Sequence, residues 1–395
     1  MAKKKAAGER KRAANGSGNI SKRPDGRYRL DINLGTNPAT GKPIRKTVYG
    51  LSAEEALAKA RKIQVQHDEG TYTEPSKLTV GQWLDVWHDE YLGNVKADTA
   101  KQYESYIRVH LKPTLGHVKL SALSPHMVQA LCNKAQRSTD DKKGLSAKSV
   151  RNMCGILHAA MEKAVSLSYI KSNPTNSVTM PRIERREMTV IKDDDVSRFL
   201  EAIKGDAYEC VYLMDLFTGL RLGEILGLRW ACADFDKGTI FVEKQLKRRK
   251  GDTHYLASLK TDRTRTLTPS AYVMNLLRQQ RTRQREQQLK AGGAYKNAMG
   301  LVFTNDTGGH LVGNTVYKHL KAIVKGLGLD AVRFHDLRHS FALLSLQNGD
   351  DIKTLQENMG HATISTTLNI YGHVSERMKA ESAAKMDAYI GTLGL

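Results

Sequence analysis

Residues 334–371 read FHDLRHSFALLSLQNGDDIKTLQENMGHATISTTLNIY, and the rest of the chain is organised around this stretch. His335 and Arg338 stand three residues apart at the start of a helical pattern. His361 follows a glycine at a turn, and Tyr371 comes ten residues later. These four side chains indicate a functional site, because each can bind a phosphate, move a proton or attack an electrophile.

Two more cations lie upstream, Arg221 in the run TGLRLGE and Lys260 in LKTDRTRT. In phosphoryl transfer, negative charge grows on the non-bridging oxygens, and preorganised cations counter it, each worth about 10²–10³ in rate when removed. A guanidinium suits this task because its fork of donors matches two phosphate oxygens. Lysine can protonate a departing sugar oxygen, and histidine can shuttle a proton. A tyrosine has a pKa near ~10, so its attack needs a base or a strong cationic field.

In order and context these residues resemble the signature of the tyrosine recombinases, and the chain looks like an integrase of a conjugative transposon or temperate phage. The resemblance covers the whole chain, and all six active-site positions are filled. The matching positions are Arg221, Lys260, His335-x-x-Arg338, Gly360-His361 and Tyr371-Gly372.

The resemblance implies the role of each residue. Tyr371 would attack the scissile phosphate, giving a 3′-phosphotyrosyl link and a free 5′-hydroxyl. Because this link conserves the energy of the broken bond, no cofactor is implied, neither a nucleotide nor a metal ion. Arg221, Arg338 and His361 would bind the phosphate. Lys260 would protonate the leaving group, and His335 would assist proton transfer.

A metal site is an alternative interpretation of the same stretch. His335-Asp-Leu-Arg-His339 resembles the zinc-protease pattern H-E-x-x-H with aspartate in place of glutamate, and two histidines four residues apart can share a metal ion. That pattern alone often misleads, and we expect no metal here. We expect structural roles for His339 and His373, and we expect Glu224 to orient an arginine.

Two further classes share part of the pattern. A type IB topoisomerase uses the same chemistry but rejoins the same strand. A DNA-binding or architectural protein without activity would need neither Tyr371 nor Lys260. The N-terminal domain and the apolar C-terminal tail described below favour recombination between strands.

Charge and length limit the class of partner. The chain has 395 residues, with 62 Lys and Arg against 41 Asp and Glu, a net charge of +21. This excess points to a polyanion, since each neutralised phosphate releases counterions. No stretch approaches the about 18 apolar residues of a membrane-spanning helix, and the first residues lack the apolar core of a signal peptide. With four widely spaced cysteines, these features predict a cytoplasmic bacterial protein without membrane contact, at the nucleoid when DNA is bound.

Composition and periodicity divide the chain into segments. The expected boundaries are 1–18 for a basic disordered arm, 19–70 for a small N-terminal domain, 77–180 for a helical domain and 187–395 for a catalytic domain with a C-terminal tail.

The N-terminal domain is expected to be a small three-stranded sheet with one helix. Alternating apolar residues predict strands over 28–34 and 44–49, and Ser52 opens a helix. The apolar face would pack on the helix and leave Arg27 and Arg29 on the other face. Because a β-ribbon can enter a major groove, this face is a candidate for DNA binding. By resemblance, the domain binds arm sites away from the crossover.

The next segment is expected to be a four-helix unit, which by resemblance clamps one side of the DNA at the core site. A basic connector follows, in which Arg182 and Arg185 are candidates for contact with DNA. The helices are expected to begin near Thr79, Thr99, Ser124 and Ser146.

In the catalytic segment, Arg221 is expected at the start of a helix. A strand over Thr239–Gln245 leads into a basic run, Lys247-Arg248-Arg249, that we expect to contact DNA. Lys260 is expected at the tip of a hairpin, from which it would enter the site only when DNA is in place. The tail carries an apolar stripe at helical spacing: Met386, Tyr389, Ile390 and Leu393.

The expected fold is therefore mainly α with small β-sheets, in the three-domain architecture of tyrosine recombinases. The expected partners are double-stranded DNA at core and arm sites and further copies of the chain in a homotetramer on DNA. The sequence leaves open the target sites and the need for an excision factor.

Overall fold

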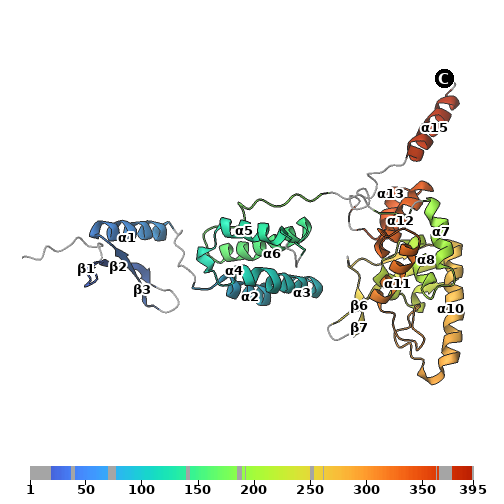
Figure 1. Ribbon diagram of the computed structural model, residues 1–395, viewed down its shortest axis with the longest axis horizontal. Coiled ribbons are helices and arrows are strands. Elements are labelled where there is room, and N and C mark those ends of the chain that lie inside the picture. The colour runs from blue at the N-terminus through green and yellow to red at the C-terminus, as the bar shows by residue number, and fades with distance from the viewer. Residues whose placement is uncertain are drawn as a thin grey trace, which may run out of the picture. The chain divides into compact units, whose positions relative to one another are not determined.

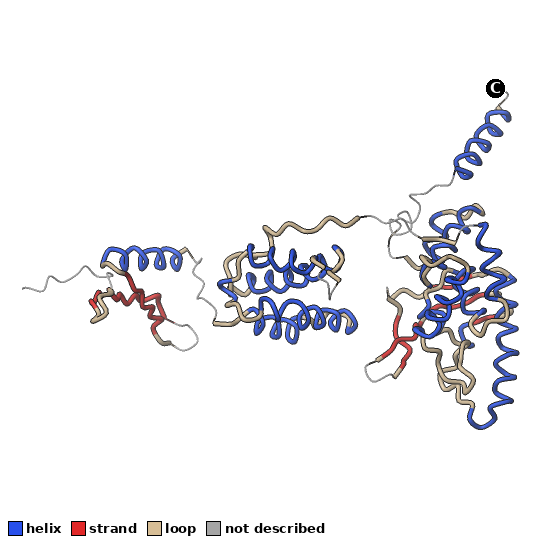
Figure 2. Tube along the Cα trace, in the orientation of Figure 1, coloured by secondary structure: helices blue, strands red, loops and turns tan. Residues whose placement is uncertain are grey.

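The structure is a computed structural model that describes residues 19–36, 41–69, 77–138, 143–184, 189–191, 193–249, 253–260, 262–361, 363 and 376–393. It separates into two compact units, residues 1–185 and 186–395. Figure 1 labels the elements, and Figure 2 distinguishes helices, strands and loops.

The first unit opens with a three-stranded antiparallel sheet in the order β1-β2-β3, covered on one face by α1 (Figure 1). Ser52 accepts the backbone N–H of Glu55 at 3.1 Å and so caps the helix. The core consists of Leu30, Ile32, Leu34 and Val48 against Ala56 and Ala60. The elements are β1 (Asn19–Lys22), β2 (Tyr28–Thr36), β3 (Pro43–Gly50) and α1 (Ala53–Asp68).

A helical bundle forms the rest of the first unit. Thr79, Ser124 and Ser146 cap three of its helices, as expected. Trp83 is fully buried, and its indole N–H donates to the Ala160 carbonyl at 2.9 Å. The second expected helix contains one π-helical turn, η1. The elements are α2 (Val80–Tyr91), α3 (Ala97–Tyr106), η1 (Ile107–Leu111), α4 (Lys112–Leu115), η2 (Leu120–Ala122), α5 (Pro125–Gln136) and α6 (Ala147–Ser166).

The second unit packs helices around a large buried apolar core, with a smaller apolar cluster between α12 and α13 and two small sheets, β4-β5-β8 and β6-β7. Its elements are α7 (Asp193–Ile203), α8 (Glu209–Thr218), α9 (Leu222–Leu226), η3 (Trp230–Cys232), β4 (Ala233–Asp234), β5 (Thr239–Val242), β6 (Lys244–Arg248), β7 (His254–Ser258), β8 (Arg265–Leu267), α10 (Ala271–Ala291), η4 (Gly292–Ala294), α11 (Gly313–Gly326), α12 (Phe334–Gln347), α13 (Ile352–Met359) and α15 (Glu376–Thr392).

The single strand expected over Thr239–Gln245 is wrong, because the chain changes sheets at Glu243. The Glu243 carboxylate accepts hydrogen bonds from the Arg229 guanidinium and, at 3.3 Å, from the Cys232 thiol. These contacts anchor the residue between β5 and β6, so β5 pairs with β8 while β6 pairs with β7.

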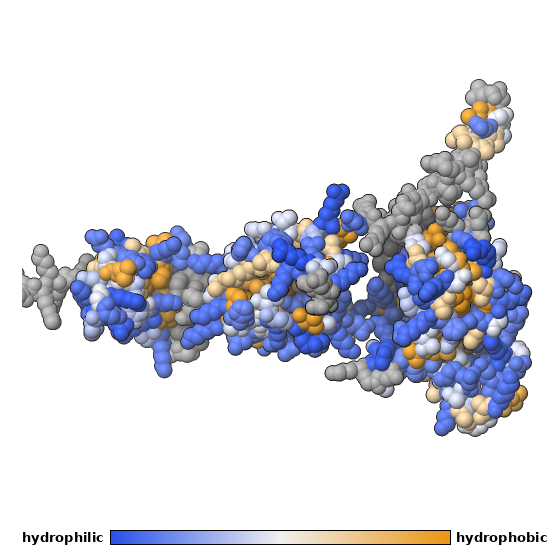
Figure 3. Space-filling model, in the orientation of Figure 1, coloured by the Kyte–Doolittle hydropathy of each residue, from blue (hydrophilic) through white to orange (hydrophobic). Residues whose placement is uncertain are grey.

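The mainly helical fold with small antiparallel sheets is confirmed. Within the described ranges no helix combines the length and the apolar character that crossing a bilayer requires. On α15 the expected apolar stripe is exposed to solvent, and Figure 3 shows orange atoms on the surface of this helix. The exposed fractions are 58% for Met386, 60% for Tyr389, 37% for Ile390 and 57% for Leu393.

Candidate active site

Arg221 is the residue at which α9 begins, as expected. The preceding helix, α8, ends at Gly219, whose φ of +62° lies in the left-handed region and turns the chain sharply. Glu224 accepts the backbone N–H of Arg221 at 3.1 Å and its guanidinium at 2.8 Å. The carboxylate therefore orients the Arg221 side chain, which remains 22% exposed.

A second arginine, which the sequence did not single out, shares this carboxylate. Arg265 on β8 donates to Glu224 Oε2 at 2.7 Å and to the Asn358 carbonyl at 2.8 Å. Burial by itself would raise the pKa of Glu224, but hydrogen bonds and charge from Arg265 and Arg221 lower it below the usual value. Glu224 is thus an anion that holds two guanidiniums in place.

Arg338 is buried on α12, with 1% of its surface exposed. Its guanidinium donates to the backbone carbonyls of Gly219 and Met359, at the C-terminal ends of α8 and α13. Helix C-termini carry partial negative charge, so both ends stabilise the cation. Burial, followed by repulsion from Arg221, nevertheless lowers the pKa of Arg338 to about 9. The side chain joins three helices at one point.

The turn after α13 brings His361 to the same place. Gly360 ends the helix with φ of +62°, and its carbonyl accepts from Arg221 Nη2 at 3.3 Å. A Cβ on Gly360 would lie 2.8 Å from Nη1 of Arg265, so only glycine leaves room for that guanidinium. The position of His361 therefore depends on glycine at 360, because another residue there would disturb both the left-handed backbone and the close approach of the Arg265 guanidinium.

Two of the nearby histidines are neutral near pH 7. Burial, followed by the charges of His339 and Arg338, lowers the pKa of His335 to about 4, although part of the residue is exposed to solvent. Burial, followed by Arg338 and Arg221, lowers the pKa of His361 to about 3. A neutral imidazole can accept or donate a proton, so both rings can assist proton transfer.

Lys260 lies in the turn between β7 and β8, and its side chain is exposed. The expected position at a hairpin tip is wrong, because strand pairing runs from Lys244–Ser258 to Arg248–His254 and leaves Lys260 at the open end. That end is closed by Ser258 Oγ, which donates to the Asp262 carboxylate at 2.8 Å. Because β6 packs against α9, the turn that carries Lys260 is attached to the helix that begins at Arg221.

Of the expected catalytic residues, the structure brings together Arg221, Arg338, His335 and His361, and the charges of the two arginines help to lower the pKa of both histidines. Tyr371 lies outside the described residues. Arg265 was missed because its run of alternating arginines and threonines is also what an exposed strand shows. Only the position of β8 against α9 and α13 places its side chain on Glu224.

The expected DNA-contacting residues occupy separate surfaces of the two units. Arg27 and Arg182 are exposed, and Arg29 pairs with Asp31 at 2.9 Å while staying 46% exposed. Arg185 lies outside the described residues. The basic run follows β6 to its far end: Lys247 is half-buried, Arg248 is exposed, and Arg249 lies over the Tyr255 ring at 5.0 Å.

The alternative metal site lacks a third ligand among the described residues. The rings of His335 and His339 meet edge to face with centroids 4.8 Å apart. Nearby Asp336 is already paired with Arg333 at 2.9 Å, and no group of three or more His, Cys, Asp or Glu residues gathers anywhere in the described ranges. Two imidazoles alone do not make the three- or four-ligand set of a zinc site.

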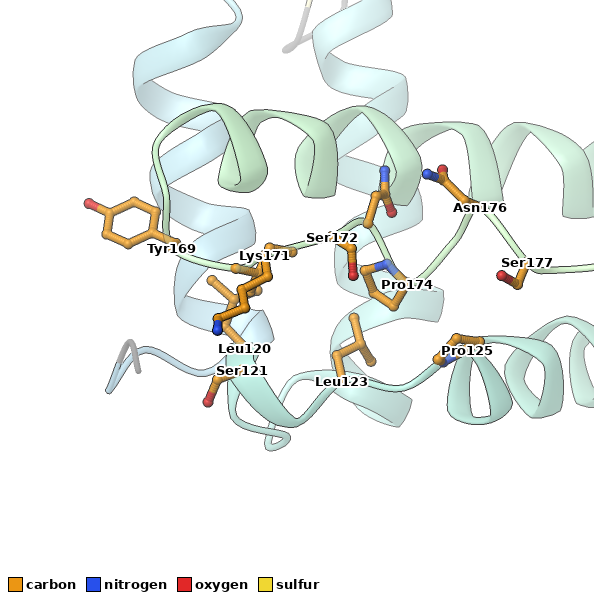
Figure 4. Close-up of a pocket in the computed structure, with 12 residues that line it drawn as sticks. Leu120, Ser121, Leu123, Pro125, Tyr169, Lys171, Ser172, Pro174, Asn176 and Ser177 are labelled. Carbon is orange, nitrogen blue, oxygen red and sulfur yellow. The ribbon is translucent and has the colours of Figure 1, made fainter. Parts of the chain in front are cut away.

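A large open pocket lies in the helical bundle rather than at the arginines (Figure 4). Its volume is about 490 Å³, and its walls include Leu120 and Ser121 from η2 and Tyr169 and Lys171 from the segment after α6. No arginine or histidine lines this pocket, so we place the candidate active site at the buried arginines.

Comparison with known protein families shows the class to which this fold and site belong. The Phage integrase family matches residues 189–378, and the family described as "Phage integrase, N-terminal SAM-like domain" matches residues 79–136. The chain belongs to the phage integrase family and is a tyrosine recombinase, an enzyme of site-specific DNA recombination.

Individual relatives match the chain over most of its length. A tyrosine recombinase XerC-like protein of Caldanaerobacter subterraneus subsp. tengcongensis is 30% identical over 380 residues, covering 91% of this chain and 95% of the relative. The ICEBs1 integrase of Bacillus subtilis is 24% identical over 378 residues, covering 93% of this chain and 99% of the relative.

Solved structures share the fold. The Tn1549 transposon integrase in complex with a circular intermediate DNA aligns with a TM-score of 0.66 and 22% identity over 78% of this chain and 100% of the other. A lambda integrase dimer bound to a COC′ core site aligns with a TM-score of 0.55 and 18% identity over 93% and 98%. The three-domain recombinase architecture expected from the sequence is thereby confirmed.

Proposed function

We propose that this chain cleaves and rejoins double-stranded DNA through a 3′-phosphotyrosyl link on Tyr371, and so integrates and excises a mobile element. The observation that carries this proposal is the convergence of Arg221, Arg338 and two neutral histidines at the ends of α8 and α13. Such a set binds a phosphodiester and stabilises the charge that grows on it during displacement.

The two arginines contribute in different ways. Arg221 keeps an exposed surface and is held by Glu224, so it offers a preoriented fork to an incoming phosphate. Arg338 is buried, but a guanidinium has five N–H donors, and the two carbonyls that it binds leave donors for the phosphate. Because Arg338 is almost completely buried, its charge acts more strongly than it would in water.

Proton transfer falls to three other residues. Lys260 would protonate the leaving 5′-oxygen, reaching the site from the turn between β7 and β8. His335 would assist this transfer, and His361 would donate to a phosphate oxygen, since both rings are neutral and carry one N–H near pH 7. The cations would also favour the phenolate form of Tyr371 as it attacks.

DNA binding is proposed for all three domains, with boundaries at 19–70, 77–180 and 187–395. In the N-terminal sheet, Arg29 and Asn33 on β2 stand beside Tyr49 and Arg45 on β3, respectively, on the face opposite α1. This polar and basic face would enter a major groove at arm sites. The connector residues Arg182 and Arg185, together with the run Lys247-Arg248-Arg249, would hold the phosphates of the core site.

The direct test uses DNA from the ends of the element that carries this gene. After incubation, a denaturing gel should show a covalent protein–DNA adduct, and two duplexes should exchange strands. Relaxation of supercoiled DNA without exchange between duplexes would instead favour the topoisomerase alternative. DNA binding without any adduct would favour an architectural protein. We place the protein in the bacterial cytoplasm, where its substrate lies.

Excess chelator is expected to leave the rate of adduct formation within about twofold of the untreated rate. The guanidiniums and histidines would supply the electrostatic stabilisation that a metal ion provides in other phosphoryl-transfer enzymes. Cleavage is measured with and without chelator at equal ionic strength. If cleavage were lost on chelation and restored by zinc, His335 and His339 would have to be reconsidered as ligands.

A chain that starts near Pro75 is expected to cleave core-site DNA at close to the full-length rate but to lose about tenfold or more in affinity for arm DNA. The physical reason is that the N-terminal sheet has a hydrophobic core of its own, separate from that of the bundle. Gel-shift titrations with arm and core duplexes measure both affinities. Equal arm binding by the two chains would contradict the proposed role of residues 19–70.

Removing residues from Ser382 onward is expected to weaken synaptic complexes and unbalance cleavage, while binding to a single site persists. Exchange between two duplexes needs four cleavages, hence a homotetramer on DNA. An exposed apolar stripe on a single helix gains stability only when it is buried, and docking of this helix from one protomer to the next can close a ring. Native gels and recombination assays measure assembly. Full recombination by the shortened chain would assign the tail to packing within its own protomer.

A further inference from the structure

A buried carboxyl lies beside the arginine cluster without a hydrogen-bond partner. Asp215 on α8 is 1% exposed, and within the described part of the chain neither of its carboxyl oxygens has a partner. A buried polar group left unpaired costs about 1–3 kcal/mol, and a charged one costs more. The other side chains buried along α8 are mostly apolar, so an acid at this position calls for an explanation.

The packing of α8 on α12 places Asp215 opposite Arg338. Near the start of α8, the Tyr212 ring lies 6.2 Å from the Phe334 ring. At its end, Gly219 touches the Phe341 ring so closely that a Cβ would collide with it. Asp215 lies between these two contacts on α8, and Arg338 lies between them on α12. The charges of the two side chains act on each other, and the guanidinium also binds the Gly219 carbonyl.

Among the described residues, the charged groups that act on Asp215 come from two helices. Arg338 on α12 attracts its negative charge and Glu224 on α9 repels it, while α10 adds the apolar side chains Val273, Met274 and Leu277 to the same core. Burial, the largest effect, raises the pKa of Asp215 well above its usual value. The three guanidiniums of Arg221, Arg265 and Arg338 exceed the charge of Glu224 by two, and an ionised Asp215 would remove one of those two charges.

We propose that Asp215 is a positioning residue that acts through Arg338 and that its protonation state controls how well Arg338 binds the scissile phosphodiester. When Asp215 is protonated, the Arg338 guanidinium is available to the phosphodiester. When Asp215 is ionised, its carboxylate competes with the phosphodiester for the guanidinium. In this step a proton from solvent binds the Asp215 carboxylate as the phosphodiester binds Arg338. Because linkage is reciprocal, the proton and the phosphodiester each increase the affinity for the other. The inference rests on the proposed function.

The test compares intact protein with Asp215→Asn, which keeps the shape of the side chain but does not titrate. The rate of adduct formation at subsaturating core-site DNA is measured from about pH 6 to about pH 9.5, and the ratio of variant to intact protein is plotted. The pH dependence that arises from all other groups is common to both proteins and cancels in the ratio. The ratio should be level at low pH and rise by up to about tenfold per pH unit above the pKa of Asp215. Asp330→Asn, an exposed acid of the same unit, should give a level ratio throughout.

A level ratio for Asp215→Asn over the whole range would overturn the inference, whatever the absolute rate. If this variant does not fold, Asp215→Leu serves for the same measurement. If neither folds, calorimetry decides: Tyr371→Phe protein is titrated with core-site DNA at about pH 8 in two buffers that differ in ionisation enthalpy. Proton uptake on binding supports the inference, and its absence overturns it. Failure of the intact protein to form any Tyr371-dependent adduct would refute the proposed function instead, so the two failures are distinguishable.

Discussion

Tyr371→Phe is expected to abolish the covalent protein–DNA adduct while leaving DNA affinity within about twofold of the intact protein. The substitution removes the attacking oxygen and nothing else, so the loss should lie in the chemical step rather than in binding. Adduct is measured on denaturing gels with a suicide substrate that traps the cleaved strand, and affinity is measured by gel shift.

Tyr389→Phe provides the matched control. Tyr389 lies on α15 with 60% of its surface exposed, and loss of its hydroxyl should leave adduct formation at the intact level. Substantial adduct from the Tyr371 variant would mean that another residue is the nucleophile. In that case the cluster of arginines would still bind phosphate, but the assignment of the attacking group would be wrong.

Arg338→Ala is expected to slow adduct formation by about 10²–10³. The guanidinium would lose its contact with the phosphate, and the carbonyls of Gly219 and Met359 would be left buried without their donor. Some loss of stability should therefore accompany the loss of rate. Single-turnover cleavage is measured at a temperature at which circular dichroism shows the variant to be folded.

Two comparisons separate chemistry from stability. Lys353→Ala removes an exposed cation from α13 and should leave the rate unchanged. Arg221→Ala should lower the rate by a similar factor with less effect on melting temperature, since Arg221 is partly exposed. A folded Arg338 variant that cleaves at the intact rate would exclude this residue from phosphate binding.

Local signals in the sequence determined the secondary structure. Ser52, Thr79, Ser124 and Ser146 begin helices because their side-chain oxygens satisfy backbone N–H groups that a helix leaves unpaired. Alternating apolar residues in β2 bury one face against α1. Such effects involve residues a few positions apart, so the sequence shows them directly. The ordered set from Arg221 to Tyr371 likewise indicated the family.

Only the tertiary structure decided how the site is held together. Arg265 reaches Glu224 from 41 positions along the chain, and Arg338 reaches the Gly219 carbonyl from 119. Lys260 lies at the open end of its hairpin because strand pairing stops at Lys244 and Ser258. In the sequence, Asp215 is a polar residue in a mostly apolar helix, and only the packing of α12 shows that a buried guanidinium lies opposite it. Periodicity reports which face of an element is buried, whereas the partner of a buried charge depends on how distant elements pack.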